Sequence, residues 1–168
     1  DWTSCRLRRK GFETAVGRFG KSRNASVIQL PPYRNATEVA EAVRREFPKA
    51  LASAARPLGV LAVNDCVALA VMEYAREHDL AVPQEVAVVG FNNDIEGALA
   101  EVPLTTVEIP REEIAGHAVQ LMMEQIEGGR REPKRIRLKP RLVLRQSCGC
   151  YSAPRREDAC GKAVSSEQ

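Results

Sequence analysis

Three apolar runs in this chain each end at side chains that can hold a ligand. The runs cover residues 27–30, 58–63 and 86–90. Uninterrupted apolar runs rich in β-branched residues are typical of strands buried on both faces of a parallel sheet. The residues that follow the runs include Tyr33, Asn64, Asp65, Asn92 and Asp94. Because ligands bind beyond the carboxyl ends of such strands, we expect these side chains to share one edge of the sheet.

Helical patterns alternate with the apolar runs, which predicts an α/β fold built on a parallel, Rossmann-like sheet. The expected helices cover 4–19, 35–47, 65–78 and 110–127, and the expected strands cover 26–30, 58–63, 85–90, 104–107, 135–138 and 141–145. Pro48 is expected to end or bend the second helix. An alanine-rich segment over 49–56 is expected to add a helical turn, and residues 91–103 to form a loop or short helix.

Length and composition exclude several classes of protein. The 168 residues suffice for one domain with its own core, and a net charge of +3 is too weakly basic to indicate nucleic acid. No apolar stretch approaches the roughly 20 residues that span a bilayer, and no signal peptide opens the chain. Five cysteines without a disulfide pattern favour the reducing cytoplasm. Cys148 and Cys150 lack the further ligands that a zinc site needs.

The motifs of the common enzyme classes are missing from the sequence. It contains no glycine-rich phosphate loop and no nucleophile elbow, and neither His78 nor His117 has the neighbours of a catalytic triad. Asp65 and Asp94 form the one candidate for a catalytic carboxylate pair. A helix cap for Asp65 and a loop position for Asp94 explain these residues more simply. We therefore predict a binding domain without a cofactor or metal.

The side chains expected at the sheet edge suit a polyhydroxyl ligand. Planar amides and guanidinium groups hold sugar hydroxyls, and an aromatic ring packs against the apolar face of a sugar. Asn64 and Asn92 supply the amides, Arg8 on the first helix supplies the guanidinium, and Tyr33 supplies the ring. A second set of candidate contacts consists of Ser4, Asp65 and Asp94. Ser4 also suits the N-cap of the first helix.

Five segments together resemble the effector-binding domain of lactose-repressor and galactose-repressor (LacI/GalR) regulators. They are residues 63–68, 82–92, 103–107, 114–116 and 142–148. Regulators of the xylose-operon type share this domain and remain an alternative. The resemblance covers about residues 4–150 and implies a periplasmic-binding-protein-like fold, in which two α/β lobes close on a small ligand.

By this resemblance, residues 1–150 are mainly the C-terminal lobe of an effector domain whose N-terminal lobe is mostly missing. The chain also lacks an initiator Met, so we expect it to be part of a longer protein. The polar tail over 151–168 is expected to be disordered. In the intact family, the helix over 110–127 belongs to the other lobe.

The resemblance also implies roles for individual residues. Arg8, three residues before Gly11, matches an arginine that contacts effector, and Tyr33 and Asn64 match further contact positions. Asn92 stands where the family usually has an aspartate. Because a neutral amide donates as well as accepts hydrogen bonds, the ligand is expected to be more anionic or differently hydroxylated than is usual.

The implied function is a cytoplasmic sensor of a small carbohydrate that modulates DNA binding by a helix-turn-helix domain absent from this chain. An extracytoplasmic solute-binding protein of the same fold is the alternative. The helix over 110–127 would lack its usual partner for an apolar face formed by Ile114, Ala118, Leu121, Met122 and Ile126. Exposed apolar stripes promote association, so we expect this helix to fold back, swap between chains or form a homodimer.

Overall fold

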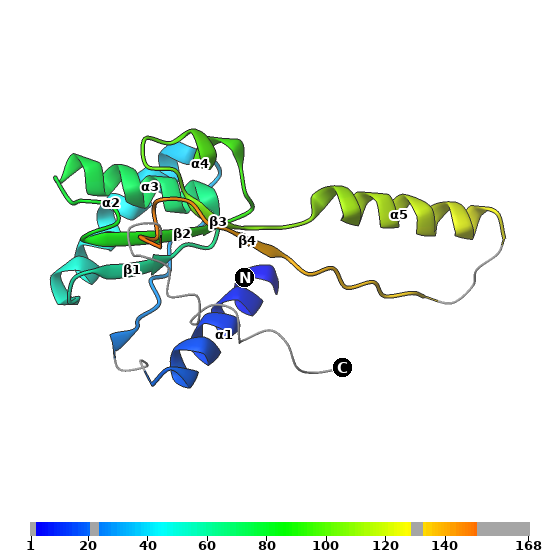
Figure 1. Cartoon of the computed structure of the whole chain (residues 1–168), viewed down its shortest axis with the longest axis horizontal. Coiled ribbons are helices and arrows are strands. Elements are labelled where there is room, and N and C mark those ends of the chain that lie inside the picture. Colours follow the sequence, from blue (N-terminus) through cyan, green and yellow to red (C-terminus); the bar gives the residue numbers. More distant parts are fainter. Residues whose placement is uncertain (1–2, 21–23, 129–132, 151–168) are drawn as a thin grey trace.

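A four-stranded sheet with helices on both sides forms the body of the molecule (Figure 1). The structure, a computed structural model, describes residues 3–20, 24–128 and 133–150. Within these residues the strands are β1 (Leu58–Leu61), β2 (Val86–Phe91), β3 (Thr105–Glu108) and β4 (Arg141–Val143). The helices are α1 (Thr3–Arg18), α2 (Ala36–Ser53), α3 (Asp65–Glu77), α4 (Ile95–Leu99) and α5 (Arg111–Ile126). The predicted α/β class is confirmed.

The sheet is mostly parallel and its strands follow the order β1-β2-β3-β4. β1 pairs in parallel with β2, β2 pairs in parallel with β3, and β4 joins β3 as an antiparallel edge strand. The carboxyl ends of β1, β2 and β3 therefore meet at one edge. That edge is where the residues following the predicted strands gather.

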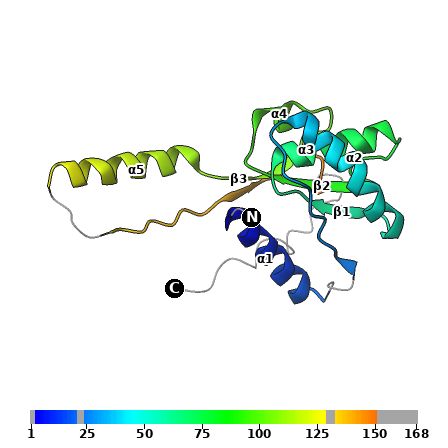
Figure 2. The ribbon, with the colours of Figure 1, turned by 180° about the vertical axis from the view of Figure 1, so that it is seen from behind.

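The core lies between the sheet and the helix pair α2–α3, while α1 lies on the other side of the sheet (Figures 1 and 2). Side chains in β2 alternate strictly, with Val86 and Val88 fully buried and the residues between them half-exposed. The expectation of strands buried on both faces is therefore wrong for this chain. No residue of α1 is buried, so this helix covers the second face only loosely.

Two expected strands are absent from the described residues. Residues 26–30 and 135–138 have no ladder partner and run without regular secondary structure. Val27 and Ile28 are largely exposed, so their β-branched side chains find no sheet to join. β4 also ends at Val143 rather than at Arg145. The backbone N–H of Arg145 donates to the Thr105 side-chain oxygen (2.9 Å) instead of extending the ladder.

The second helix includes the alanine-rich segment that was expected to add a helical turn. α2 continues through Pro48 to Ser53, so Pro48 does not end the helix. Phe47 is buried in the core just before the proline, and Leu51 packs against the same core one turn later. These contacts hold both sides of the proline turn in helical conformation. At the other end, Asn35 caps α2 by accepting a hydrogen bond from the Glu38 N–H (2.9 Å).

Helix α5 extends away from the sheet as an arm, and residues 133–140 return alongside it (Figures 1 and 2). No residue of α5 is buried. A groove of about 560 Å³ lies between the helix and the returning segment, lined by Ile114, Ala118, Leu121, Ile136 and Leu138 among others. Three residues of the predicted apolar face thus line this groove. Met122 and Ile126 remain exposed. None of the described helices has the length and apolar character needed to cross a bilayer.

Gly90 in β2 provides a test of how tightly the sheet packs on α3. A Cβ at this position would lie 2.1 Å from Asp65 Oδ1 and 3.1 Å from Leu104 Cδ2, and both of these residues are fully buried. We expect Gly90→Ala to lower the free energy of unfolding by about 3 kcal/mol, because overpacking must displace buried atoms. Urea denaturation followed by circular dichroism measures the change.

The matched control is Gly59→Ala in the neighbouring strand β1. A Cβ there meets nothing within 4 Å. Adding it should change stability by less than about 1 kcal/mol. Equal unfolding midpoints for the two variants would show that the close packing at Gly90 has no energetic consequence.

Candidate ligand-binding site

Asn64 joins the end of β1 to both α3 and the segment that carries Tyr33. Its side-chain oxygen caps α3 by accepting a hydrogen bond from the Val67 N–H (2.9 Å). Its side-chain nitrogen donates to the Tyr33 hydroxyl (3.0 Å). Asn64 and Tyr33 are both half-buried. The structure therefore brings these two predicted residues into direct contact at the carboxyl edge of the sheet.

Arg8 reaches the same edge from α1. Its guanidinium donates a hydrogen bond to the Val63 carbonyl, next to Asn64. The guanidinium carbon also lies 4.5 Å from the ring centroid of Phe91, the last residue of β2. Such a cation–π contact contributes about 0.5–1 kcal/mol at an exposed site. Arg8 thus bridges the ends of β1 and β2.

Phe91 lies at the same edge, and the sequence analysis did not include it among the candidate residues. The available signal was its position, directly after the third apolar run and directly before the polar group Asn92–Asp94. What the sequence does not contain is the pairing of this ring with Arg8. That contact joins residues 83 positions apart (91 − 8) and depends on where α1 settles.

Asn92 follows β2 in a left-handed conformation, with φ of 116°. Its backbone N–H donates to the Val107 carbonyl (2.9 Å), and its carbonyl accepts from Arg111 (2.7 Å). Asparagine tolerates positive φ better than most residues, which gives a backbone reason for its presence. Among the described residues, no hydrogen-bond partner holds its side-chain amide.

Asp65 lies inside the lobe, fully buried, and both of its carboxylate oxygens are occupied. Oδ1 accepts from the Thr106 hydroxyl (2.6 Å), and Oδ2 accepts from the Asp94 N–H (2.8 Å). Burial raises the pKa of the Asp65 carboxyl, although these two hydrogen bonds oppose the rise by favouring the charged form. The carboxylate therefore ties α3 to β3 and to the loop after β2.

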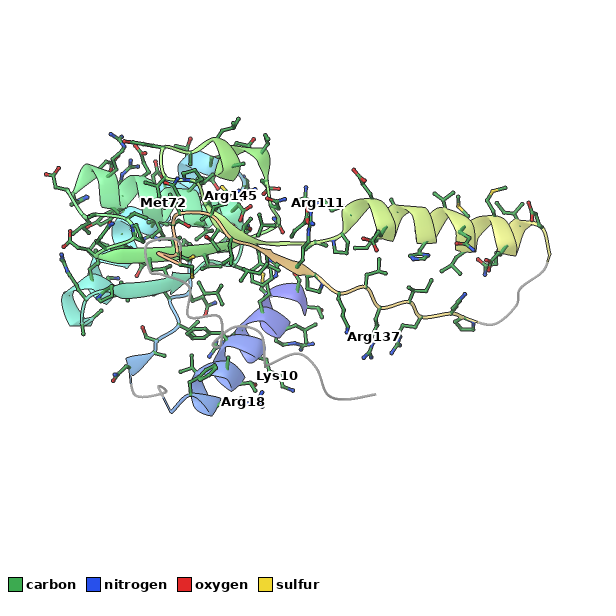
Figure 3. The ribbon with its side chains drawn as sticks, viewed as in Figure 1. Lys10, Arg18, Met72, Arg111, Arg137 and Arg145 are labelled. Atoms are coloured by element: carbon green, nitrogen blue, oxygen red, sulfur yellow. The ribbon has the colours of Figure 1, made fainter. Side chains whose placement is uncertain are left out.

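The other two members of the second candidate set occupy different environments. Asp94 forms a salt bridge with Arg111 (2.6 Å), and Figure 3 shows Arg111 where α5 leaves the sheet. Ser4 is exposed and already lies within α1, which begins at Thr3. Its position does not match the N-cap that the sequence suggested.

A second polar network beside the site was also missed. The side-chain oxygen of Asn93 accepts from Arg145 (2.7 Å), and its nitrogen donates to Glu108 (3.0 Å). Arg145 also donates to the Leu104 carbonyl (2.7 Å). Asn93 itself has a positive φ of 57°. These bonds hold the loop that carries Asn92 and Asp94. Among the described residues, no group of three or more His, Cys, Asp or Glu side chains could hold a metal.

Residues 2–148 match the family of periplasmic binding protein-like domains, and the chain belongs to this family. The predicted fold, a parallel-sheet α/β lobe of the periplasmic-binding-protein-like type, is therefore confirmed. The motif-based resemblance to LacI-type regulators is confirmed by the relatives described next.

The repressor "HTH-type transcriptional repressor MelR" of Bacillus subtilis strain 168 is 34% identical over 106 residues, covering 63% of this chain and 30% of the repressor. A LacI-family transcriptional regulator from Sanguibacter keddieii DSM 10542 has 32% identity and a TM-score of 0.74, covering 85% of this chain and 53% of that one. A LacI-family regulator from Arthrobacter sp. FB24, solved in complex with lactose, has 27% identity and a TM-score of 0.69, covering 83% and 49%. The chain thus spans about half or less of each of these proteins.

The buried Asp65 carboxyl yields a prediction about pH. Its pKa is raised in the folded state above the ordinary value of 3.8. The stability that the protonated Asp65 carboxyl adds to the fold is therefore fully present below pH 3.8. This stability is lost as the pH rises through the higher pKa of the folded state. Asp65→Asn cannot ionise, so the stability of this variant relative to the unsubstituted chain should increase from about pH 4 toward neutrality. Urea denaturation at a series of pH values measures the difference.

Asp79→Asn is the matched control, because Asp79 is exposed and has a positive φ of 54° that asparagine tolerates. The change with pH should be larger for Asp65→Asn than for Asp79→Asn, because Asp65 is fully buried and Asp79 is exposed. A relative stability of Asp65→Asn that fell with rising pH would contradict the raised pKa.

Proposed function

We propose that this chain is the effector-sensing domain of a bacterial transcriptional regulator and that it binds a small sugar-like ligand. The observation that carries the proposal is the convergence of Arg8, Tyr33, Asn64 and Asn92 at the carboxyl edge of the sheet. Tyr33 contacts Asn64, Arg8 contacts the residue before Asn64, and Arg8 also covers the ring that precedes Asn92.

The chemistry of this edge suits a carbohydrate. The amide of Asn92 has no partner among the described residues and can both donate to and accept from hydroxyl groups. Arg8 supplies N–H donors in a planar arrangement, and Tyr33 supplies an aromatic ring. The complex of the Arthrobacter relative with lactose supports a carbohydrate over other small molecules.

The helix-turn-helix repressors among the relatives support a role for this chain in modulating DNA binding. In the proposed regulator, a segment outside these 168 residues contacts DNA, and the protein acts in the cytoplasm. The ligand acts by binding two arrangements of the regulator with different affinities, since only that difference shifts the population. The same relatives favour a regulator over a solute-binding protein and over an enzyme. The full engagement of Asp65 in structural hydrogen bonds also favours a binding function over catalysis.

The proposed site predicts the effect of single substitutions on affinity. In the regulator that contains this chain, Arg8→Ala and Asn92→Ala should each weaken carbohydrate binding at least about tenfold, or 1.4 kcal/mol, because each removes hydrogen bonds to hydroxyls. Truncating Tyr33 should weaken binding of a sugar with an apolar face more than binding of an anion. Isothermal titration calorimetry with a panel of mono- and disaccharides measures the affinities.

Arg9→Ala is the matched control for Arg8, because Arg9 is exposed on the same helix and pairs with Glu13 (2.7 Å). It should leave the affinity unchanged. If Arg8→Ala and Asn92→Ala both bind the sugar as tightly as the unsubstituted regulator, the assigned site is wrong.

We also propose a homodimer in which α5 supplies an apolar surface. Val119, Met122, Met123 and Ile126 are all about half or more exposed on this helix. α5 does not fold back on the sheet (Figure 1), which leaves exchange between chains or face-to-face pairing. Burial of side chains of this size contributes about 1.5–3 kcal/mol each.

Ile126→Glu should therefore weaken self-association of the 168-residue chain at least about tenfold. Sedimentation equilibrium over a range of concentrations measures the change. Leu99→Glu is the control, because Leu99 is equally exposed (78%, against 70% for Ile126) but lies on α4. A chain that is monomeric at all concentrations would contradict the dimer.

A further inference from the structure

A tight turn over residues 146–150 brings two cysteines together. The Gly149 N–H donates to the Gln146 carbonyl (3.0 Å), and Gly149 has a positive φ of 75°. The chain therefore bends back after Cys148, so that the Cys150 N–H lies 3.5 Å from the Cys148 sulfur. The Cys148 sulfur thus lies directly against the backbone of Cys150.

The turn is fixed to the sheet by the residue before Cys148. Ser147 is fully buried, and its hydroxyl donates to the Val88 carbonyl (2.6 Å) and accepts from the Thr105 N–H (2.8 Å). Its own carbonyl accepts from the Val88 N–H (2.8 Å). Because these bonds span β2 and β3, the position of Cys148 is set by the sheet. The Cys148 sulfur is therefore held beside the Cys150 backbone, and bringing the Cys150 side chain to it needs little further ordering.

The surroundings of Cys148 favour its thiolate. Burial opposes ionisation, but hydrogen bonds from the Thr105 hydroxyl and from the side chain and backbone of Cys150 outweigh it, and the pKa of the Cys148 thiol is lowered. Cys148 is half-buried and Cys150 is exposed, so a small oxidant can reach the pair. The thiolate is the form of cysteine that reacts with oxidants.

We propose that Cys148 and Cys150 form a modification site that hydrogen peroxide converts to a reversible disulfide. The Cys148 thiolate attacks one peroxide oxygen, the O–O bond breaks, and the leaving hydroxide takes up a proton to become water. Cys148 is then a sulfenic acid. The Cys150 sulfur attacks the Cys148 sulfur, forms the S–S bond and expels a second water. Two thiols are oxidised to one disulfide, and one peroxide is reduced to two waters.

Cys66 in the same chain is a built-in reference. It is half-buried in the first turn of α3. Burial and the nearby carboxylates of Asp94 and Glu96 raise the pKa of its thiol. No second cysteine lies beside it among the described residues. Cys66 should therefore react with peroxide at least about tenfold more slowly than Cys148.

The test exposes the full 168-residue chain to limiting hydrogen peroxide, followed by trypsin digestion and mass spectrometry. Cleavage after Arg145 and Arg155 gives one peptide that contains both cysteines. This peptide should lose the mass of two hydrogen atoms and regain it on reduction with dithiothreitol. In Cys150→Ser the disulfide should be absent, and dimedone should label Cys148 as a sulfenic acid. Cys150→Ala should give the same result if the serine variant folds poorly.

Three results would overturn the proposal. One is dimedone labelling or oxidation of Cys66 as fast as that of Cys148. Another is a disulfide that joins Cys148 to Cys160, which Cys160→Ser would abolish. The third is an unchanged peptide mass at peroxide levels that already oxidise Cys66. A disulfide that forms normally in Cys160→Ser and is lost in both Cys148→Ser and Cys150→Ser supports the assignment.

Discussion

The buried carboxylate of Asp65 is the interaction on which the arrangement of this lobe depends. It stands at the first turn of α3 and receives hydrogen bonds from β3 and from the loop after β2. A buried carboxylate is costly unless its oxygens are bonded, and each hydrogen bond to a charged group contributes about 1.5–3 kcal/mol. Gly90 leaves the space that the carboxylate occupies. The carboxylate thus fixes the loop that carries Asn92.

Much of the sheet and the gathering of the site residues could be predicted from the sequence. Apolar runs followed by polar residues were enough to locate β1 and β2, and parallel strands bring their carboxyl ends together by geometry. The apolar pattern could not decide whether residues 26–30 and 135–138 form strands. Their composition suits strands, but a strand needs a partner, and the choice of partners is made by tertiary structure.

The contacts that complete the site were beyond reach of the sequence for the same reason. Arg145 and Asn93 are separated by 52 positions, and neither residue signals the other. The Asn64 side chain stabilises the fold and also contacts another residue of the candidate site. One end of its amide caps α3 and the other reaches Tyr33. Asn92 likewise combines an unusual backbone angle with an amide that no described residue engages.

Arg111 joins the arm to the site. It stands at the first turn of α5 and holds both the Asn92 carbonyl and the Asp94 carboxylate. On the other side of the same loop, Asp94 is bonded through its N–H to Asp65. A rotation of the arm about its base must therefore either break these bonds or carry the Asn92 backbone with it. The orientation of α5 and the shape of the carboxyl edge of the sheet are thus linked through the Arg111 side chain.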